Sequence, residues 1–232
     1  MGKLFIVATP IGNLEDITLR ALKTLKEVDI ILAEDTRSTK NLLRHHGIST
    51  ESKRLISFFE GNEARRLPEI IAILQQSEDV VLVSESGTPL ISDPGFKLVR
   101  EIVRLNIPVE AIPGPNAAIT ALSISGLPTN AFLFLGFLPK KESHVRNLFS
   151  STRSTAKNTP QLKTIIAYES PHRLVKTLFL IKEIFGDKDL VVARELTKVY
   201  EEVRREKVSL AIEHFTKNKP RGEFVILFSL SN

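Results

Sequence analysis

Short apolar runs alternate with amphipathic stretches along the first half of the chain. The runs that predict strands are Leu4–Ala8, Ile30–Ala33, Val80–Val83 and Val109–Ile112. Between them, apolar residues recur at helical spacing in Leu19–Val28, with Asp16 as the expected N-cap, and in Leu67–Leu74, Phe96–Leu105 and Ala117–Ser125. Strands that are apolar on both faces and alternate with helices are typical of a mainly parallel sheet covered on both sides.

A second group of elements follows Leu127-Pro128-Thr129, which reads as a hinge. The expected strands are Phe132–Leu138, Thr164–Tyr168, Leu190–Ala193, Glu201–Glu206 and Glu223–Ser229, and the expected helices are Pro171–Ile184 and Ser209–Lys217. The stretch Ser150–Thr159 is rich in Ser, Thr, Lys and Arg and predicts a mobile loop. The sequence therefore predicts two α/β domains, residues 1–126 with a mainly parallel sheet and residues 127–232 with a mixed sheet.

Composition narrows the possible functions. Without Cys, neither a disulfide nor a thiolate metal site can form, and the five His are too scattered to predict a metal site. The N-terminus does not look like a signal peptide, and no apolar run reaches the roughly 18 residues of a spanning helix. We therefore expect a cytoplasmic protein without a membrane segment. The net charge of +5 fits a polyanionic partner or ordinary surface charge, and alone it does not decide between them.

Three turn-rich segments each follow a predicted strand: Thr9–Asn13, Ser86–Gly95 and Pro113–Ala117. Each combines Gly and Pro with small polar residues, so the backbone can approach a ligand closely, although any one of them alone could be only a tight turn. Ligands of open α/β sheets bind beyond the carboxyl ends of the strands. No strand is followed by G-x-G-x-x-G or a P-loop, which argues against a dinucleotide or a nucleoside triphosphate.

Longer motifs keep a fixed order over almost the whole chain. They are Ala8–Thr18, Ala33–Arg37, Gly87–Gly95, Pro113–Pro115, Ser125–Pro128, Gly136–Lys141, Tyr168–Leu174, Ala193–Lys198 and Arg221–Glu223. In these motifs the chain resembles the bacterial small-subunit ribosomal RNA (cytidine ribose 2′-O)-methyltransferases, within the tetrapyrrole-methylase-like class. It departs from their pattern at Glu85-Ser86, where relatives typically have Asp-Ala. Relatives also usually continue beyond the last strand, whereas this sequence stops at Asn232.

The resemblance implies a homodimer of two-domain subunits that holds S-adenosyl-L-methionine in the cleft between the domains and methylates RNA of the small ribosomal subunit. The positions that it implies for contact with this methyl donor are Pro10, Gly87, Thr88, Ile91, Asn116, Ala117, Tyr168, Ala193 and Gly222.

Charged residues at the ends of the predicted strands are the catalytic candidates, namely Glu34, Asp35, Arg37, Glu169 and Arg194. Glu34 or Glu169 would accept the proton of the ribose hydroxyl, and the guanidinium groups would hold phosphates. The alternative for these charges is a structural network of salt bridges. The expected RNA contacts are Lys140, Lys141 and Arg173. Two other functions stay open, a tetrapyrrole carbon methyltransferase and a ribosome-assembly factor without activity.

Overall fold

The computed structural model describes residues 1–230, so the end of the chain at Asn232 lies outside the described residues. Contacts divide the chain into two compact units, Met1–Asn116 and Ala117–Asn232. Within residues 1–230, no helix is both long and apolar enough to cross a membrane.

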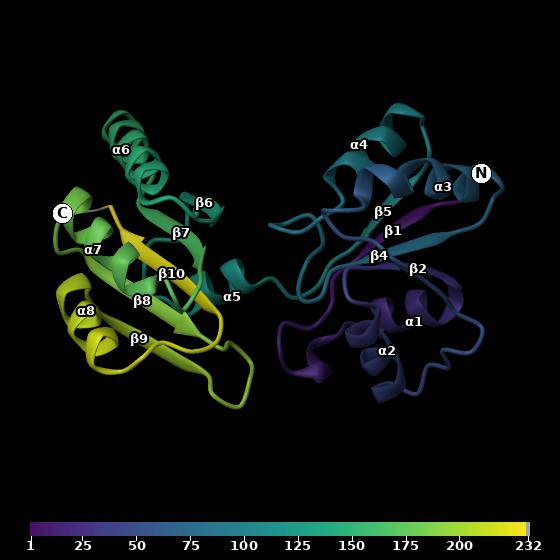
Figure 1. Ribbon diagram of the computed structural model, residues 1–232, viewed down its shortest axis with the longest axis horizontal. Helices are drawn as coiled ribbons and strands as arrows, with labels where there is room; N and C mark the ends of the chain where they lie inside the picture. The colour runs from purple at the N-terminus through teal and green to yellow at the C-terminus, as the bar shows by residue number, and fades with distance from the viewer. Residues whose placement is uncertain (231–232) are drawn as a thin grey trace. The chain divides into compact units, whose positions relative to one another are not determined.

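The first unit contains a five-stranded sheet of order β3-β2-β4-β1-β5 in which every neighbouring pair is parallel (Figure 1). Its strands are β1 (Leu4–Val7), β2 (Ile30–Ala33), β3 (Arg54–Ser57), β4 (Val80–Val83) and β5 (Val109–Ile112). Its helices are the short 3₁₀ helix η1 (Leu14–Asp16), α1 (Leu19–Glu27), α2 (Thr36–His45), α3 (Glu63–Gln75) and α4 (Phe96–Arg104). The predicted parallel α/β architecture is confirmed.

The alternation of side chains along each strand gives this sheet two apolar faces. In β4, Val80 and Leu82 pack with residues of α3 and α4, whereas Val81 and Val83 pack with residues of α1 and α2. All four are at most 1% exposed, and each fully buried side chain of this size contributes about 1.5–3 kcal/mol to folding. Because helices cover both faces, the sheet is open to ligands at the ends of its strands.

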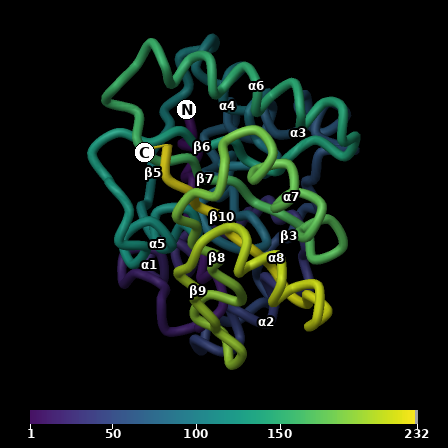
Figure 2. Tube along the Cα trace, turned by 90° about the vertical axis from the view of Figure 1, so that its left-hand side faces the viewer, coloured from purple at the N-terminus to yellow at the C-terminus, as the bar shows by residue number. Residues whose placement is uncertain are grey.

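The second unit contains a mixed sheet of order β6-β7-β10-β8-β9, in which only β6 and β7 are parallel. Its strands are β6 (Phe132–Phe137), β7 (Thr164–Glu169), β8 (Asp189–Arg194), β9 (Glu202–Lys207) and β10 (Phe224–Ser229). Its helices are α5 (Ala117–Ser123), α6 (Glu142–Asn158), α7 (Leu174–Phe185) and α8 (Val208–Lys217). In Figure 2, α7 and α8 lie in front of the sheet of this unit, where with α6 they bury one apolar cluster. The predicted mixed sheet is also confirmed.

The prediction of a mobile loop over Ser150–Thr159 is wrong, because α6 continues to Asn158. Val145, Phe149 and Thr152 are buried at helical spacing and fix the helix to the sheet. The Ser, Thr, Lys and Arg residues that suggested a loop are mostly exposed residues of this helix.

Smaller differences concern the first unit. Thr18, not Asp16, caps α1, since its hydroxyl oxygen accepts the N–H of Ala21 at 3.1 Å. Three elements, η1, α2 and β3, have no counterpart among the predicted ones. Only Thr39, Leu42 and Leu43 form the buried stripe of α2, and this stripe is too short for a clear periodic pattern.

Along the chain, the boundary between the two compact units falls before α5, whereas the sequence predicts a hinge after Gly126. Helix α5 contacts β7 and β10, so it packs with the second unit. Where an independently folding domain would end stays a prediction.

Candidate functional site

The connections that follow β1 and β4 single out this neighbouring pair of strands. The chain leaves β1 over the face of the sheet that α1 covers, and it leaves β4 over the opposite face, which α4 covers. Where the connections of two adjacent strands run over opposite faces, they leave room beyond the carboxyl ends of the strands, and open α/β sheets bind their ligands there.

Three loops meet beyond the carboxyl ends of these strands. Thr9, after β1, and Gly87, after β4, exchange two backbone hydrogen bonds, with N to O distances of 2.8 and 3.0 Å. The hydroxyl of Thr88 donates to the carbonyl of Pro115, after β5, at 2.9 Å. The three predicted turn segments therefore form one structure, on which Pro10, Gly87, Thr88, Ile91 and Asn116 lie.

Gly87 is at the centre of these contacts. Its φ of +82° disfavours any other residue, and a Cβ atom there would lie 3.3 Å from Cγ2 of Ile11 and 3.7 Å from the carbonyl oxygen of Pro115. The hydroxyl of Ser84 donates to the carbonyls of Ser86 and Gly87, which fixes the loop further. A side chain at position 87 would therefore enter the space shared by the three loops.

Three carboxyl groups gather beside these loops. The backbone N–H of Glu85 donates to Oε2 of Glu34 at 3.4 Å, and burial raises the pKa of Glu34 against this hydrogen bond. Burial, with the negative charge of Glu34 and to a lesser extent that of Glu85, raises the pKa of Asp93 to about 7, although a hydrogen bond with Ser84 opposes the shift. A carboxyl group with a pKa of about 7, as in Asp93, can hold or accept a proton at neutral pH.

Asp93 is a further candidate residue that the sequence does not predict. Its position in a Gly- and Pro-rich loop after a strand was the available signal. Its nearness to Glu34 depends on the pairing of β2 with β4, which the sequence pattern does not give.

Asp35 and Arg37 form a local pair at the start of α2. The carboxylate of Asp35 accepts the backbone N–H groups of Arg37 and Ser38 and so caps the helix. The Arg37 side chain, which is 89% exposed, also donates to it at 3.0 Å, and these hydrogen bonds lower the pKa of Asp35. Asp35 thus has a structural role, while Arg37 stays accessible from solvent.

Glu169, at the end of β7, has a side chain that is only 1% exposed. It accepts hydrogen bonds from the backbone N–H of Ser170 at 2.7 Å and the hydroxyl of Thr177 at 2.6 Å, and it pairs with Arg173 at 2.7 Å. A buried carboxylate with three donors is typical of a residue that fixes a structure. Glu169 as proton acceptor stays a prediction.

Arg173 extends this arrangement to the loop after β6. Its guanidinium donates to the carbonyls of Leu138 at 3.0 Å and of Pro139 at 2.9 Å. The next two residues, Lys140 and Lys141, are exposed. Arg173 therefore positions the predicted RNA-contacting lysines.

The remaining predicted residues of the second unit lie on or beside the neighbouring strands β7, β10 and β8. Tyr168 and Ala193 both pair with Val225 of β10, one from each side, and Gly222 precedes β10 with a φ of +89°. The Tyr168 hydroxyl oxygen accepts the N–H of Ala118, the residue after Ala117, at 3.2 Å. Arg194 donates to the carbonyl of Arg221 at 2.7 Å and pairs with Glu202.

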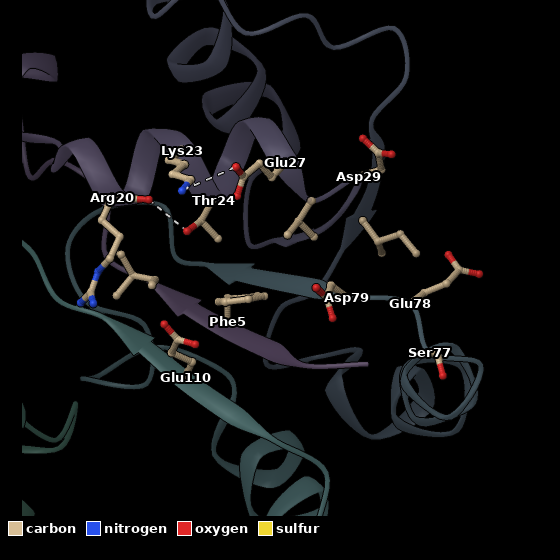
Figure 3. Close-up of a pocket in the computed structure, with 13 residues that line it drawn as sticks. Phe5, Arg20, Lys23, Thr24, Glu27, Asp29, Ser77, Glu78, Asp79 and Glu110 are labelled. Carbon is tan, nitrogen blue, oxygen red and sulfur yellow. Dashed lines mark hydrogen bonds and ion pairs between the residues drawn. The ribbon is translucent and has the colours of Figure 1, made fainter. Parts of the chain in front are cut away.

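A pocket of about 480 Å³ lies elsewhere on the first unit (Figure 3). It is lined by Asp29 and Asp79, which precede β2 and β4, and by residues of α1. It is therefore at the opposite end of the strands from the three loops, and none of the predicted site residues lines it. Among residues 1–230, no three His, Asp or Glu side chains are placed to hold a metal ion.

Comparison with known proteins places the chain among methyltransferases. The family model of the tetrapyrrole (corrin/porphyrin) methylases matches residues 3–211. The chain is 49% identical over 229 residues to "Ribosomal RNA small subunit methyltransferase I" of Thermotoga maritima, covering 99% of both chains. It is 47% identical to the protein of the same name from Hydrogenobaculum sp., covering 99% of this chain and 96% of that one.

A solved structure shares the fold at low sequence identity. Uroporphyrin-III C-methyl transferase from Thermus thermophilus, complexed with S-adenyl homocysteine, matches with a TM-score of 0.66 and 16% identity, covering 98% of this chain and 97% of that one. Similarity at this identity concerns the fold.

Proposed function

The chain belongs to the tetrapyrrole (corrin/porphyrin) methylase family, and from this premise we propose that it transfers a methyl group from S-adenosyl-L-methionine to the ribose 2′-hydroxyl of a cytidine in small-subunit ribosomal RNA. The observation that carries the proposal is the joined set of three loops beyond β1, β4 and β5. The near-full-length relatives named as ribosomal RNA methyltransferases support the choice of substrate.

The residues at these loops suit the proposed methyl donor, which supplies an electrophilic methyl group on a positively charged sulfur. Gly87 leaves the space between the loops free of a side chain, and the carboxyl groups of Glu34, Glu85 and Asp93 complement a cation. The proposed donor contacts are Pro10, Gly87, Thr88, Ile91, Asn116 and Ala117, together with Tyr168, Ala193 and Gly222.

For the chemical step, the ribose hydroxyl must lose its proton while the oxygen attacks in line. Glu34 is the proposed acceptor. Its carboxyl group follows β2, burial raises its pKa, and its negative charge helps to raise the pKa of the neighbouring Asp93. Asp93, with a pKa of about 7, would share the proton that Glu34 receives. Glu169 is retained as the alternative acceptor, although its three partners favour a positioning role.

Basic side chains would bind the phosphates of the RNA. Lys140 and Lys141 are exposed after β6, and Arg173 holds their loop in place. Arg37 and Arg194 complete the proposed set. The family resemblance supports a homodimer in the cytoplasm, which we include in the proposal.

The alternatives receive less support. The tetrapyrrole methyltransferase structures share the fold at 20% identity or less, whereas the relatives at 42–49% identity are named for ribosomal RNA. The hypothesis of a ribosome-assembly factor without activity rests on the departure from the family pattern at Glu85-Ser86. The backbone N–H of Glu85 donates to Glu34 within the proposed site, so this departure leaves the site in place.

A comparison of two substrates tests the proposal. The protein is given labelled S-adenosyl-L-methionine with unmodified small ribosomal subunits in one reaction and with uroporphyrinogen III in a second reaction. We expect label in RNA alone, and Glu34→Gln should abolish most of it. Label in the tetrapyrrole would support the alternative enzyme, and donor binding without transfer to either substrate would support an inactive factor.

A further inference from the structure

The loop between β8 and β9, residues 195–201, carries two exposed apolar side chains at its tip. Val199 is 93% exposed and Tyr200 is 72% exposed. Single exposed apolar residues are common on protein surfaces, but an adjacent pair on a loop tip is a candidate contact surface.

The loop below this tip is held firmly. Leu196 is buried, the N–H of Lys198 donates to the carbonyl of Glu195 at 3.0 Å, and the carboxylate of Glu201 accepts the N–H of Thr197. Glu195 and Thr197 have positive φ angles of 49° and 64°, a conformation that non-glycine residues adopt only where neighbouring contacts impose it. The tip therefore stands on a fixed base, which lowers the entropy lost when it binds.

A second loop, residues 218–223, is bonded to the first. The N–H of Glu223 donates to Glu195 at 2.9 Å, and Lys198 bridges Glu195 at 3.2 Å and Glu223 at 2.8 Å. This second loop carries the exposed basic residues Lys219 and Arg221. The exposed side chains of Val199 and Tyr200 and the cationic side chains of Lys219 and Arg221 thus lie on two loops that are bonded to each other.

We propose that Tyr200, with Val199 beside it, stacks on an unpaired base of the substrate RNA, while Lys219 and Arg221 bind the adjoining phosphates. This inference rests on the proposed function and adds a base-stacking residue to it. Stacking on an aromatic ring beside cationic side chains is the usual way in which proteins bind single-stranded nucleic acid. A second copy of the chain fits less well, because a two-fold contact would bring Lys219 and Arg221 toward their own copies.

The test measures the affinity for unmodified small ribosomal subunits of wild type, Tyr200→Ala, Tyr200→Phe and Phe179→Ala. Phe179, on α7, is 55% exposed and serves as the matched aromatic control. We expect Tyr200→Ala to lose roughly 5- to 150-fold in affinity, whereas Tyr200→Phe keeps the ring and stays close to wild type. Lys219→Ala with Arg221→Ala should lower the salt slope of binding by about 2.

Three results would overturn the inference. Equal affinities for Tyr200→Ala and Phe179→Ala in an active enzyme would remove the stacking role and leave the proposed function intact. If the Tyr200→Ala variant changed its oligomeric state in the absence of ribosomal subunits, as measured by sedimentation, Val199 and Tyr200 would form a contact between copies of the chain instead. A wild-type protein that neither binds nor methylates the subunits would remove the proposed function and this inference with it.

Discussion

Asp93 is a residue whose protonation should be measurable. Its pKa rises from 3.8 to about 7 because of burial and the nearby negative charges of Glu34 and Glu85. Between those two pH values the folded state binds more protons than the unfolded state. The free energy of unfolding therefore falls as the pH rises from about 4 to about 7, and the loss is complete above pH 7.

Asp93→Asn should remove this effect. We expect the melting temperature of the variant to exceed that of wild type by about 4–8 °C at pH 8, which is half of the full effect of the pKa shift because Asp93 is partly exposed, and to converge with it toward pH 4. Thermal unfolding followed by circular dichroism over this range checks the prediction. A difference that does not change with pH would show that the carboxyl group of Asp93 titrates normally.

The two candidate acceptors should respond differently to loss of charge. Glu34→Gln should slow methyl transfer by about 10²-fold or more while donor affinity stays nearly unchanged. Glu169→Gln weakens a buried pair with Arg173, so it should mainly lower the melting temperature. Single-turnover rates, donor calorimetry and melting curves of both variants separate these effects. A slow Glu169→Gln of normal stability would instead make Glu169 the acceptor.

Gly87 tests the position of the donor. Gly87→Arg should abolish donor binding, because its side chain would enter the space beside Ile11 and Pro115. Gly47→Arg is the matched control, since Gly47 also has a positive φ of 67° but no atom lies within 4 Å of a Cβ there. Calorimetry with S-adenosylhomocysteine compares the two. Normal binding by Gly87→Arg, or equal losses in both variants, would place the donor elsewhere.

At the scale of elements, the start of α6 and the loop before it carry the predicted phosphate contacts. Lys140→Ala with Lys141→Ala should weaken binding to small subunits and lower its salt slope by about 2, while donor binding is spared. Lys157→Ala with Lys163→Ala, near the other end of α6, is the control. If the slope of the first variant does not change, the RNA passes elsewhere and Lys140 and Lys141 are ordinary surface charge.

Apolar periodicity was enough to predict most elements and both sheets. The apolar pattern does not predict an element in which only a few residues are buried. The edge strand β3 has only Leu55 and Ile56 as apolar residues, so it did not stand out. In α6 the buried residues begin at Val145, ahead of the polar stretch that by itself predicts a loop.

The parts of the candidate site that depend on local residue chemistry can be predicted from the sequence. The parts that depend on which strands and helices pack together cannot. Gly and Pro after strands predict the three loops, and hydrogen bonds join these loops in the structure. The partners of Glu169 and the group around Asp93 depend on which strands and helices come together. No residue pattern along the chain reports those contacts.

At the scale of the whole molecule, the proposed reaction is methylation of a ribose hydroxyl of ribosomal RNA. The net charge of +5 and the exposed Lys140, Lys141, Lys219 and Arg221 favour a polyanionic substrate. Only the position of the transferred methyl group separates ribose methylation from methylation of a base.

The most direct measurement gives the protein labelled S-adenosyl-L-methionine and unmodified small ribosomal subunits, then digests the RNA with alkali. A 2′-O-methyl group protects the adjoining phosphodiester, because the free 2′-hydroxyl is the group that attacks it. We predict that the label appears in an alkali-resistant dinucleotide with cytidine as its methylated residue. Label released in mononucleotides would mean methylation of a base, and RNA without label would contradict the account as a whole.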